Sequence, residues 1–196
     1  MRIVGILLAA GRATRFGGDK LLAPLVQGAA DVAPGTPIGV ASALHLVAAL
    51  PRSLAVVRPG DAGLAAALGA TGLSIVECDN ADEGMGASLA CGVAASRDAD
   101  GWVVALADMP WIASSTILAV AQAIEHGDDL AAPFYQGRRG HPVGFARRLH
   151  AALAALRGDA GARAILITNE GSIARVDVDD PGVVRDVDTR ADMSPE

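Results

Sequence analysis

The stretch IVGILLAAGRATRFGGDKLL, residues 3–22, decides the fold of this chain. Its apolar run, Ile3 to Leu8, has the length and composition of a buried parallel strand, and it ends in Ala-Ala-Gly. A loop that carries positive charge follows, with Arg12, Arg15 and Lys20 as its cations. Small side chains let backbone N–H groups approach phosphate oxygens, while Arg and Lys neutralise the phosphate charge. The stretch therefore predicts a first strand that leads into a binding loop for a phosphorylated ligand.

The spacing in this loop differs from that of the two best-known phosphate loops. Gly11 is followed by five residues before Gly17, so the pattern G-x-G-x-x-G is absent. Lys20 is preceded by Asp19 and followed by Leu21, which is not the context of a Walker A lysine. The loop therefore belongs to another class of phosphate-binding site.

Length and composition favour one α/β domain. The chain has 196 residues, enough for a single substantial core, so residues 1–196 are predicted to form one domain that ends in a polar tail at 190–196. Apolar residues make up 52% and aromatic residues only 3%, so Ala, Val and Leu must fill the core. This composition suits helices packed on a parallel sheet better than an aromatic-rich β-sandwich.

Apolar and amphipathic segments alternate along the chain, which predicts a three-layer α/β/α sandwich with a mostly parallel sheet. Helices are expected at 39–50, 61–68 (capped by Asp61), up to about 95, 114–126 (capped by Ser114), 147–156 and 161–166. Strands are expected at 3–8, 54–57, 73–76, 103–106, 130–135, 142–145, 173–178 and 183–187. Ligands bind beyond the carboxyl ends of such strands, so Ala9–Gly11 and Asp108 should share one crevice.

Charge and cysteine content exclude several kinds of partner. The formal net charge is −6, whereas a nucleic acid or an anionic membrane requires a broad basic face. Cys78 and Cys91 lack zinc spacing and cannot form a disulfide framework, which indicates reduced thiols and a cytoplasmic protein. No segment has the length of a transmembrane helix, and the N-terminal apolar run is too short for a signal peptide.

The segment from Leu8 to Lys20 resembles the signature L-A-A-G-x-x-x-R-[MF]-G-x-x-K of the nucleotidyltransferases. The chain as a whole, from Leu8 to Asp192, resembles the molybdenum cofactor cytidylyltransferases and guanylyltransferases, with six motifs in the family's order. This resemblance implies a Rossmann-like nucleotidyltransferase fold and a Mg²⁺-dependent transfer of a nucleotide from an NTP to a phosphorylated acceptor, with release of pyrophosphate. L-A-A-G resembles the cytidylyl branch, so CTP and a molybdopterin-type acceptor are expected, and a molybdoenzyme or its chaperone is the implied protein partner.

The resemblance also implies the residues of the phosphate and metal site. Lys20, Arg15 and Asp108 are expected to be catalytic, with Asp108 in L-x-D-M-P as a magnesium ligand. On local sequence alone, a cap of the turn before Pro110 would be the favoured role of Asp108. The string Asp-Val-Asp-Thr at 186–189 implies Asp188 as the second metal ligand, with Asp186 as the alternative. Arg-Ala-Asp at 190–192 replaces the family's Pro-Glu-Asp, so the turn there should differ.

The nucleotide site is expected to combine the first loop with a second loop that resembles the family's N-x-x-x-x-G-M-x-x-S. A helix N-terminus with free N–H groups and a small hydroxyl binds anionic or carbonyl oxygens, although Asn80 and Ser88 could also be simple helix caps. The predicted nucleotide-binding residues are Leu8, Ala9, Ala10, Gly11, Arg12, Lys20, Asn80, Gly84 and Ser88.

The acceptor site is expected around the turn Arg-Arg-Gly-His-Pro at 138–142, which resembles the family's G-x-x-G-H-P. A basic turn suits a phosphorylated acceptor, so Arg139, Gly140 and His141 are predicted to bind it, together with Arg163 in the similar segment G-D-x-G-A-R. His141 could act as a general base because its usual pKa is near neutrality, but a phosphate nucleophile is already ionised. We therefore interpret His141 as a residue that positions the acceptor.

Four alternatives have recognisable differences. A guanylyltransferase of the family more often reads L-A-G-G, and a sugar-phosphate nucleotidyltransferase usually has a longer chain. A dinucleotide-binding oxidoreductase needs G-x-G-x-x-G and an acidic residue at the end of its second strand, where this chain has Val57-Arg58-Pro59. A non-catalytic protein that hands a cofactor to its enzyme could keep the pocket but would not turn over nucleotide.

Overall fold

The computed structural model describes residues 1–12, 16–28 and 32–193. Within them, an eight-stranded sheet has the order β3-β2-β1-β4-β7-β5-β6, and β8 pairs with β5. The strands β3, β2, β1 and β4 are parallel, and β7 is antiparallel to both β4 and β5. The strands are β1 (Ile3–Leu8), β2 (Ser53–Val57), β3 (Ser74–Glu77), β4 (Gly101–Leu106), β5 (Leu130–Tyr135), β6 (Arg138–Arg139), β7 (Val143–Ala146) and β8 (Ile173–Asp177).

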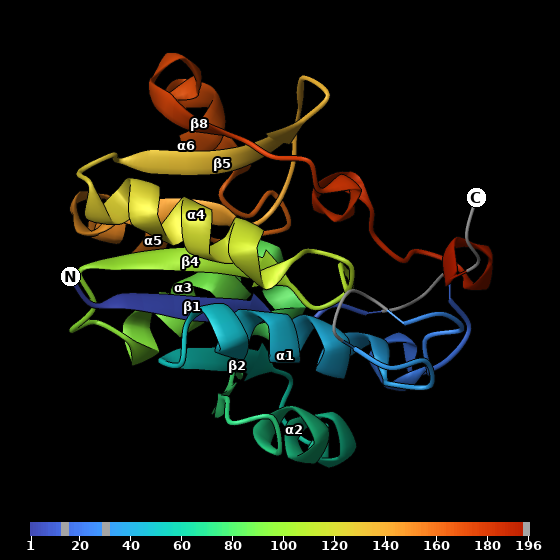
Figure 1. Cartoon of the computed structure of the whole chain (residues 1–196). Coiled ribbons are helices and arrows are strands. Elements are labelled where there is room, and N and C mark those ends of the chain that lie inside the picture. Colours follow the sequence, from blue (N-terminus) through green and yellow to red (C-terminus); the bar gives the residue numbers. More distant parts are fainter. Residues whose placement is uncertain (13–15, 29–31, 194–196) are drawn as a thin grey trace.

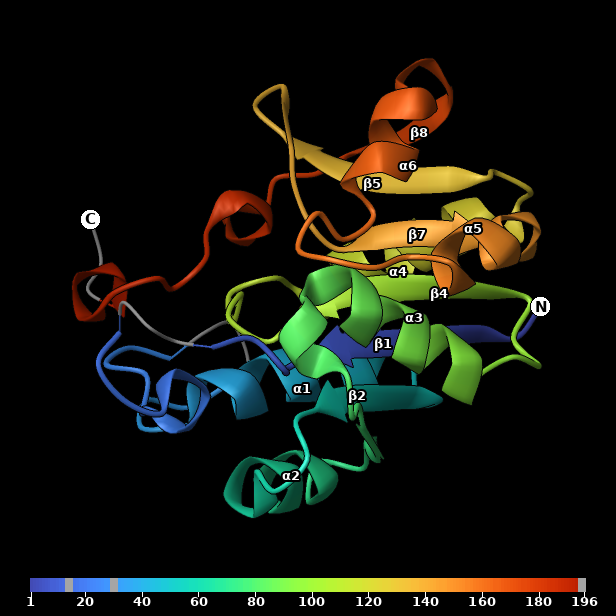
Figure 2. The ribbon, with the colours of Figure 1, turned by 180° about the vertical axis from the view of Figure 1, so that it is seen from behind.

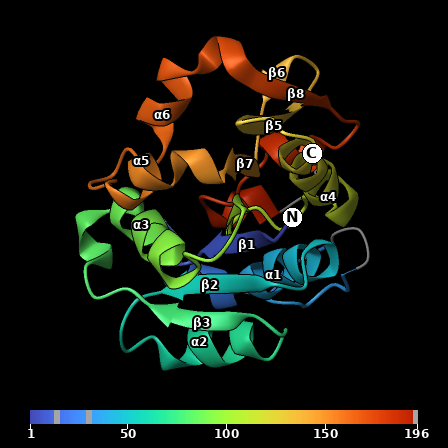
Figure 3. The same cartoon turned by 90° about the vertical axis from the view of Figure 1, so that its left-hand side faces the viewer.

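Helices cover both faces of the sheet, which confirms the predicted α/β/α arrangement. One face carries α1 and α4, and the opposite face carries α3, α5 and α6 (Figures 1 and 2). The end-on view shows these two layers on either side of the strands, with α2 beside β3 at the lower edge (Figure 3). The helices are α1 (Ile38–Ala49), α2 (Ala62–Gly69), α3 (Met85–Ala95), α4 (Ser114–Glu125), α5 (His150–Ala154) and α6 (Arg163–Thr168). None of the helices in the described ranges is both long and apolar enough to cross a bilayer.

The core explains why β1 reads as a continuous apolar run. Successive side chains of a strand point to opposite faces, so Ile6 and Leu7 enter different halves of the core, and both are fully buried. Leu7 packs in the half that includes Leu46 of α1 and Ile124 of α4. Ile6 packs in the half that includes Leu89 of α3 and Leu153 of α5. A strand covered on both faces has no position for a polar side chain.

The sequence prediction was wrong for the start of α4. Ser114 is the first residue of α4, so the N-cap position belongs to Ala113. The side chain of Ala113 makes no capping hydrogen bond. A remote carboxylate takes that role, because Oδ2 of Asp180 accepts hydrogen bonds from the N–H of Ala113 at 2.9 Å and from Oγ1 of Thr116 at 2.7 Å. Such a cap supplied from a distant segment leaves no local pattern.

The C-terminal segment also differs from its predicted form. Of the residues expected as a strand at 183–187, Val183 and Val184 end a 3₁₀ turn, Pro181–Val184, and 185–187 form neither strand nor helix. Residues 190–196 were expected to be a polar tail, but 190–193 form another 3₁₀ turn, Arg190–Met193, and Met193 is buried. Met193 joins a small apolar cluster with Phe16 and Leu25. This turn therefore packs against the loop that follows β1, beside the ends of the parallel strands (Figure 1).

Shorter 3₁₀ turns complete the chain: Lys20–Leu22, Ala81–Glu83, Arg147–Leu149 and Glu170–Ser172. The turn Arg147–Leu149 and α5 together replace the longer helix expected at 147–156. Asp61 caps α2 as predicted, since its Oδ1 accepts a hydrogen bond from the N–H of Leu64.

Candidate active site

The ends of β1 and β4 bring the two predicted loops together. Leu8 and Leu106 are register partners in the parallel pair, so the residues that follow each strand leave the sheet side by side. The N–H of Ala107 donates to the carbonyl of Leu8 at 3.1 Å, which ties the two exits together. The prediction that residues 9–11 and Asp108 share one edge is confirmed.

A cavity of about 340 Å³ opens at this edge. Its lining includes the predicted metal ligand Asp108 and eight of the nine predicted nucleotide-binding residues. These eight are Leu8, Ala9, Ala10, Gly11, Arg12, Lys20, Gly84 and Ser88. Asn80 does not line it; its side-chain oxygen accepts a hydrogen bond from the thiol of Cys78 instead. Arg15, predicted as catalytic, lies outside the residues that the structure describes. We refer to this space as the first cavity.

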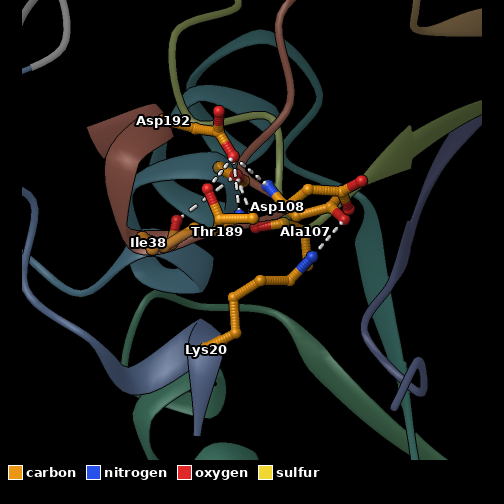
Figure 4. Close-up of polar contacts among 8 residues, drawn as sticks. Lys20, Ile38, Ala107, Asp108, Thr189 and Asp192 are labelled. Carbon is orange, nitrogen blue, oxygen red and sulfur yellow. Dashed lines mark hydrogen bonds and ion pairs between the residues drawn. The ribbon is translucent and has the colours of Figure 1, made fainter. Parts of the chain in front are cut away.

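Lys20 and Asp108 form an ion pair at one end of the first cavity. Nζ of Lys20 lies 2.8 Å from Oδ2 of Asp108, and the two side chains are 12% and 27% exposed (Figure 4). The backbone next to Asp108 is fixed by Ser42, whose hydroxyl donates to the carbonyl of Ala107 at 2.9 Å. A half-buried cation and carboxylate held on a fixed backbone form a charged end to the cavity, which a phosphate and a metal ion can enter.

The C-terminal segment passes beside this ion pair. The N–H of Val187 donates to the carbonyl of Asp108 at 2.9 Å, and the Val187 side chain is fully buried. Its neighbours Asp186 and Asp188 are both exposed. Partial removal from water, and then the negative charge of Asp108, raise the pKa of Asp186. Asp186 therefore carries a carboxyl whose ionisation is influenced by the charge of Asp108.

Asp192 holds the turn that contains Asp188. Its Oδ2 accepts hydrogen bonds from the N–H of Asp188 at 3.1 Å and from both the N–H and the hydroxyl of Thr189 at 2.6 and 2.8 Å (Figure 4). These bonds lower the pKa of Asp192. The substitution of Pro-Glu by Arg-Ala at 190–191 thus leaves a closed turn, with Asp192 as its acceptor.

Beyond this segment lies a second cavity of about 270 Å³. It is lined by the basic turn that was predicted to bind the acceptor, by Asp186 and by Leu106, which also lines the first cavity. The turn contributes Arg138, Arg139, Gly140 and His141. We refer to this space as the second cavity.

The basic turn is fixed by the segment at 181–184. The N–H of His141 donates to the carbonyl of Val183 at 2.9 Å, and a Cβ at Gly140 would collide with that same carbonyl. Nδ1 of His141 is buried and has no hydrogen-bond partner within the described ranges. Burial lowers the pKa of His141, so the imidazole is neutral at pH 7. A neutral ring with an unused nitrogen fits a role in positioning a ligand better than a role as a charged phosphate anchor.

Arg163 is the predicted acceptor residue that the structure does not bring to either cavity. It is exposed at the first position of α6 and lines neither space. The rest of its motif does reach the site, since Asp159 lines the first cavity and the carbonyl of Gly158 accepts a hydrogen bond from the N–H of Gly86 at 2.8 Å. A Cβ at Gly84 would collide with this same loop, which explains the glycine there.

Sequence reasoning missed three charged residues of the first cavity, Arg58, Asp82 and Asp159. Arg58 directly follows β2, which is the neighbour of β1, so its position at the end of a parallel strand was the available signal. Asp82 lies in the turn before α3 and binds the guanidinium groups of Arg58 and Arg12. The hydrogen bond from Arg58 and, to a smaller extent, the one from Arg12 lower the pKa of Asp82.

Residues 5–173 match the model of the family described as the MobA-like NTP transferase domain. The chain therefore belongs to the MobA-like NTP transferase family. This membership agrees with the order of motifs from Leu8 onward and with the nucleotidyltransferase-like fold.

Two curated relatives match along almost the whole chain. The purine catabolism protein PucB of Bacillus subtilis is 33% identical over 200 residues, which cover 95% of this chain and 92% of PucB. The nicotine blue oxidoreductase of Paenarthrobacter nicotinovorans is 29% identical over 204 residues, which cover 97% of this chain and 94% of that protein.

Solved structures of the same fold include a complex with a metal. The structure of Rv0371c from Mycobacterium tuberculosis has a TM-score of 0.80 and 27% identity, covering 97% of this chain and 94% of Rv0371c. A second structure of Rv0371c, in complex with manganese, has a TM-score of 0.79 and 26% identity, covering 98% and 96%. A nucleotidyl transferase from Methanothermobacter has a TM-score of 0.79 at 20% identity, covering 97% and 94%, and supports the fold.

Proposed function

We propose that this protein is a Mg²⁺-dependent nucleotidyltransferase that transfers CMP from CTP to a phosphorylated acceptor of the molybdopterin type and releases pyrophosphate. The first cavity would hold the nucleotide, and the second cavity would hold the acceptor. The family supports nucleotide transfer, and the residues that line the two cavities support the assignment of each substrate.

One observation carries this proposal: Asp108 and Asp186 line different cavities, yet partial burial and then the negative charge of Asp108 raise the pKa of Asp186. Two carboxylates that repel each other lie between the first and the second cavity. A divalent cation bound there would relieve this repulsion, and such cations favour oxygen ligands. Within the described ranges, no group of three His, Cys, Asp or Glu side chains could hold a metal. A cation here would thus need phosphate oxygens to complete its coordination, as expected for magnesium bound with a nucleotide.

The donor set therefore fits a hard divalent ion held by Asp108 and either Asp186 or Asp188. When bound, such an ion would neutralise charge on the phosphate oxygens. The manganese complex of Rv0371c is consistent with a divalent metal in proteins of this fold.

The chain's own residues would supply position and charge. Lys20, already directed at Asp108, would exchange that partner for phosphate oxygens and stabilise the charge that moves onto the leaving pyrophosphate. Arg15 would assist it from the same loop. An oxygen of the acceptor phosphate would form a bond to the α-phosphorus while the bond from that phosphorus to the bridging oxygen breaks.

At the acceptor side, Arg139 and His141 would orient the incoming phosphate. Arg139 contributes charge, and the neutral imidazole of His141, which lines the same cavity, limits where the phosphate can lie. A phosphate oxygen is ionised at neutral pH, so the reaction needs no proton transfer to this histidine.

The experiment that tests the proposal is a nucleotide-dependent assay. The protein is incubated with each NTP in turn, Mg²⁺ and molybdopterin, and pyrophosphate release is followed. We expect release with CTP that depends on both metal and acceptor. A lack of pyrophosphate with every NTP would contradict the enzyme and favour a cofactor-handling accessory protein. Turnover with GTP in place of CTP would favour a guanylyltransferase, and turnover with a sugar phosphate as acceptor would favour that class of nucleotidyltransferase.

The relative named as nicotine blue oxidoreductase motivates one further control. Oxidation of NADH or NADPH is measured with the same protein preparation. We expect none, because the chain lacks G-x-G-x-x-G and carries Arg58 rather than an acidic residue after β2.

A further inference from the structure

At the end of the first cavity away from Asp108, two arginines bind one carboxylate oxygen. Nη2 of Arg12 lies 2.8 Å from Oδ1 of Asp82, and Nη1 of Arg58 contacts the same oxygen. The three residues come from the loops after β1 and β2 and from the turn before α3, and all three line the cavity. Donor groups and an acceptor group therefore stand side by side in its wall.

The fold itself holds Arg58 in place. Its side chain is 24% exposed, against 66% for Arg12, and its buried Nε has no hydrogen-bond partner within the described ranges. A buried guanidinium N–H without a partner is costly. Nε is covered by protein atoms, so a ligand in the cavity would meet this guanidinium through its Nη atoms. Arg58 is thus a binding group that the protein's own contacts leave incompletely satisfied.

The order of the strands separates this end from the metal end. Arg58 follows β2 and Asp108 follows β4, and β1 lies between these strands. Neighbouring strands are about 4.8 Å apart, so the two ends stand roughly 10 Å apart on either side of β1. A nucleotide whose phosphates lie near Lys20 and Asp108 would extend its base toward Arg58 and Asp82.

The charges at this end favour a base over a phosphate group. Asp82 stays ionised, because both guanidinium groups lower its pKa, and an ionised carboxylate repels phosphate oxygens. A neutral ring that offers acceptors next to a donor matches guanidinium and carboxylate at once.

We propose that Arg58 and Asp82 bind the hydrogen-bonding edge of a cytosine base and reject uracil, an inference that rests on the proposed entry of CTP into this cavity. Cytosine presents O2 and N3 as acceptors for Arg58 and its 4-amino group as a donor to Asp82. Uracil presents an N3–H toward the guanidinium donors and O4 toward the carboxylate. Two mismatched contacts at once disfavour uracil relative to cytosine.

This pair and Ala10 would divide the selection of the base. Adenine and guanine also present donors next to acceptors, so Arg58 and Asp82 alone do not exclude them. Ala10 also lines this cavity, and the volume of its methyl group would limit the size of the ring instead. Size at Ala10 and hydrogen-bond pattern at Arg58 and Asp82 together specify cytosine.

The test compares the binding of CTP and UTP by calorimetry, in Mg²⁺, for the unmodified protein, Asp82→Asn and Glu83→Gln. We expect CTP to bind at least about tenfold more tightly than UTP, and Asp82→Asn to bring the ratio to within about threefold, because an amide can donate to O4. Glu83 is exposed, adjacent in sequence and outside the cavity lining, so Glu83→Gln removes the same charge and should keep the ratio. Arg58→Lys should weaken CTP more than UTP.

The outcomes separate this inference from the proposed function. If CTP binds more tightly than UTP and Asp82→Asn changes both affinities equally, the assignment of Asp82 is wrong while the proposed nucleotide stands. If Glu83→Gln changes the ratio of the CTP and UTP affinities as much as Asp82→Asn does, the loss of negative charge explains the change and base recognition by Asp82 is refuted. If neither CTP nor UTP binds, the proposed function fails and this inference fails with it.

Discussion

The N–H of Val187 donates a hydrogen bond to the carbonyl of Asp108, with 2.9 Å between nitrogen and oxygen. This bond joins the loop after β4 to a segment near the C-terminus, so the sequence neighbours of Val187, Asp186 and Asp188, lie close to Asp108. Val187 is fully buried, so the position of this segment is fixed by packing as well as by the hydrogen bond. The metal site that we propose therefore depends on the C-terminal segment as much as on the sheet.

The first prediction concerns Asp108. Asp108→Ala and Asp108→Asn should each lower turnover by about 100-fold or more, because the loss of a metal ligand removes several kcal/mol of transition-state stabilisation. Asp128→Asn, at an exposed residue remote from the site, is the matched control and should keep full activity. Circular dichroism checks that each variant folds. Turnover of Asp108→Asn near that of the control would show that Asp108 is only a turn residue.

The second prediction concerns the cations of the first loop. Lys20→Ala and Arg15→Ala should each raise the KM for CTP or lower kcat, because both remove charge that stabilises the triphosphate. The free energy of unfolding of Lys20→Ala should change by at most about 1 kcal/mol, since water can reach the partly exposed Asp108. Arg52→Ala, at an exposed arginine before β2, serves as the control for loss of charge. Variants that unfold readily but keep normal nucleotide kinetics would assign these residues a structural role.

The third prediction tests the packing of the basic turn. Gly140→Ala places a Cβ against the carbonyl of Val183, so it should lower the free energy of unfolding by about 1–3 kcal/mol. Gly171→Ala has open space at its Cβ and should change that energy little. Chemical denaturation measures both. Equal stabilities for the two variants would mean that residues 181–184 do not hold the turn.

The fourth prediction is a pH dependence of stability. Burial lowers the pKa of His141, so below about pH 6.5 the unfolded chain takes up a proton at this residue before the folded protein does. The free energy of unfolding should therefore fall between pH 7.5 and 5.5, and His141→Gln should reduce this slope. Burial raises the pKa of Asp186, so in more acidic solution this residue makes the free energy of unfolding rise as the pH falls, opposite to the effect of His141. The free energy of unfolding is measured against pH, in the presence of a chelator, for His141→Gln and for His126→Gln, an exposed control. Equal slopes of this free energy against pH in the two variants would refute the prediction.

The fold could be predicted because its signals are local. The apolar run of β1, the Asp61 cap of α2 and the alternation of strands and helices each depend on neighbouring residues, and the same-edge rule then places Ala9–Gly11 beside Asp108. The errors lie where a remote segment supplies a contact. Asp180 caps α4 from a later part of the chain, and Met193 is buried only because it meets Phe16 and Leu25.

The candidate site shows the same division. Residues of the first cavity that lie in the two loop motifs were found from the sequence, whereas Arg58 and Asp82 gave no motif because their pairing joins two loops 24 residues apart. Arg163 was predicted from a motif but is exposed outside both cavities. The part of that motif which reaches the site does so through Gly158 and Asp159, whose contacts with the turn at Gly84–Gly86 are visible only in three dimensions.

The last prediction concerns the choice between pyrimidine and purine. Ala10 lines the first cavity and is 4% exposed, and its methyl group occupies space at the end of β1 that a glycine would leave open. We therefore expect CTP to be used in preference to GTP, and Ala10→Gly to reduce that preference, because removal of a methyl group in a tight pocket changes selectivity by about tenfold or more. Ala87→Gly, in α3 behind the lining, is a matched control for the loss of a buried methyl group and should leave the preference unchanged. Competition between CTP and GTP, with each dinucleotide product quantified, measures the ratio. Equal rates with the two nucleotides in the unmodified protein would rule out the cytidylyl assignment while leaving nucleotide transfer itself intact.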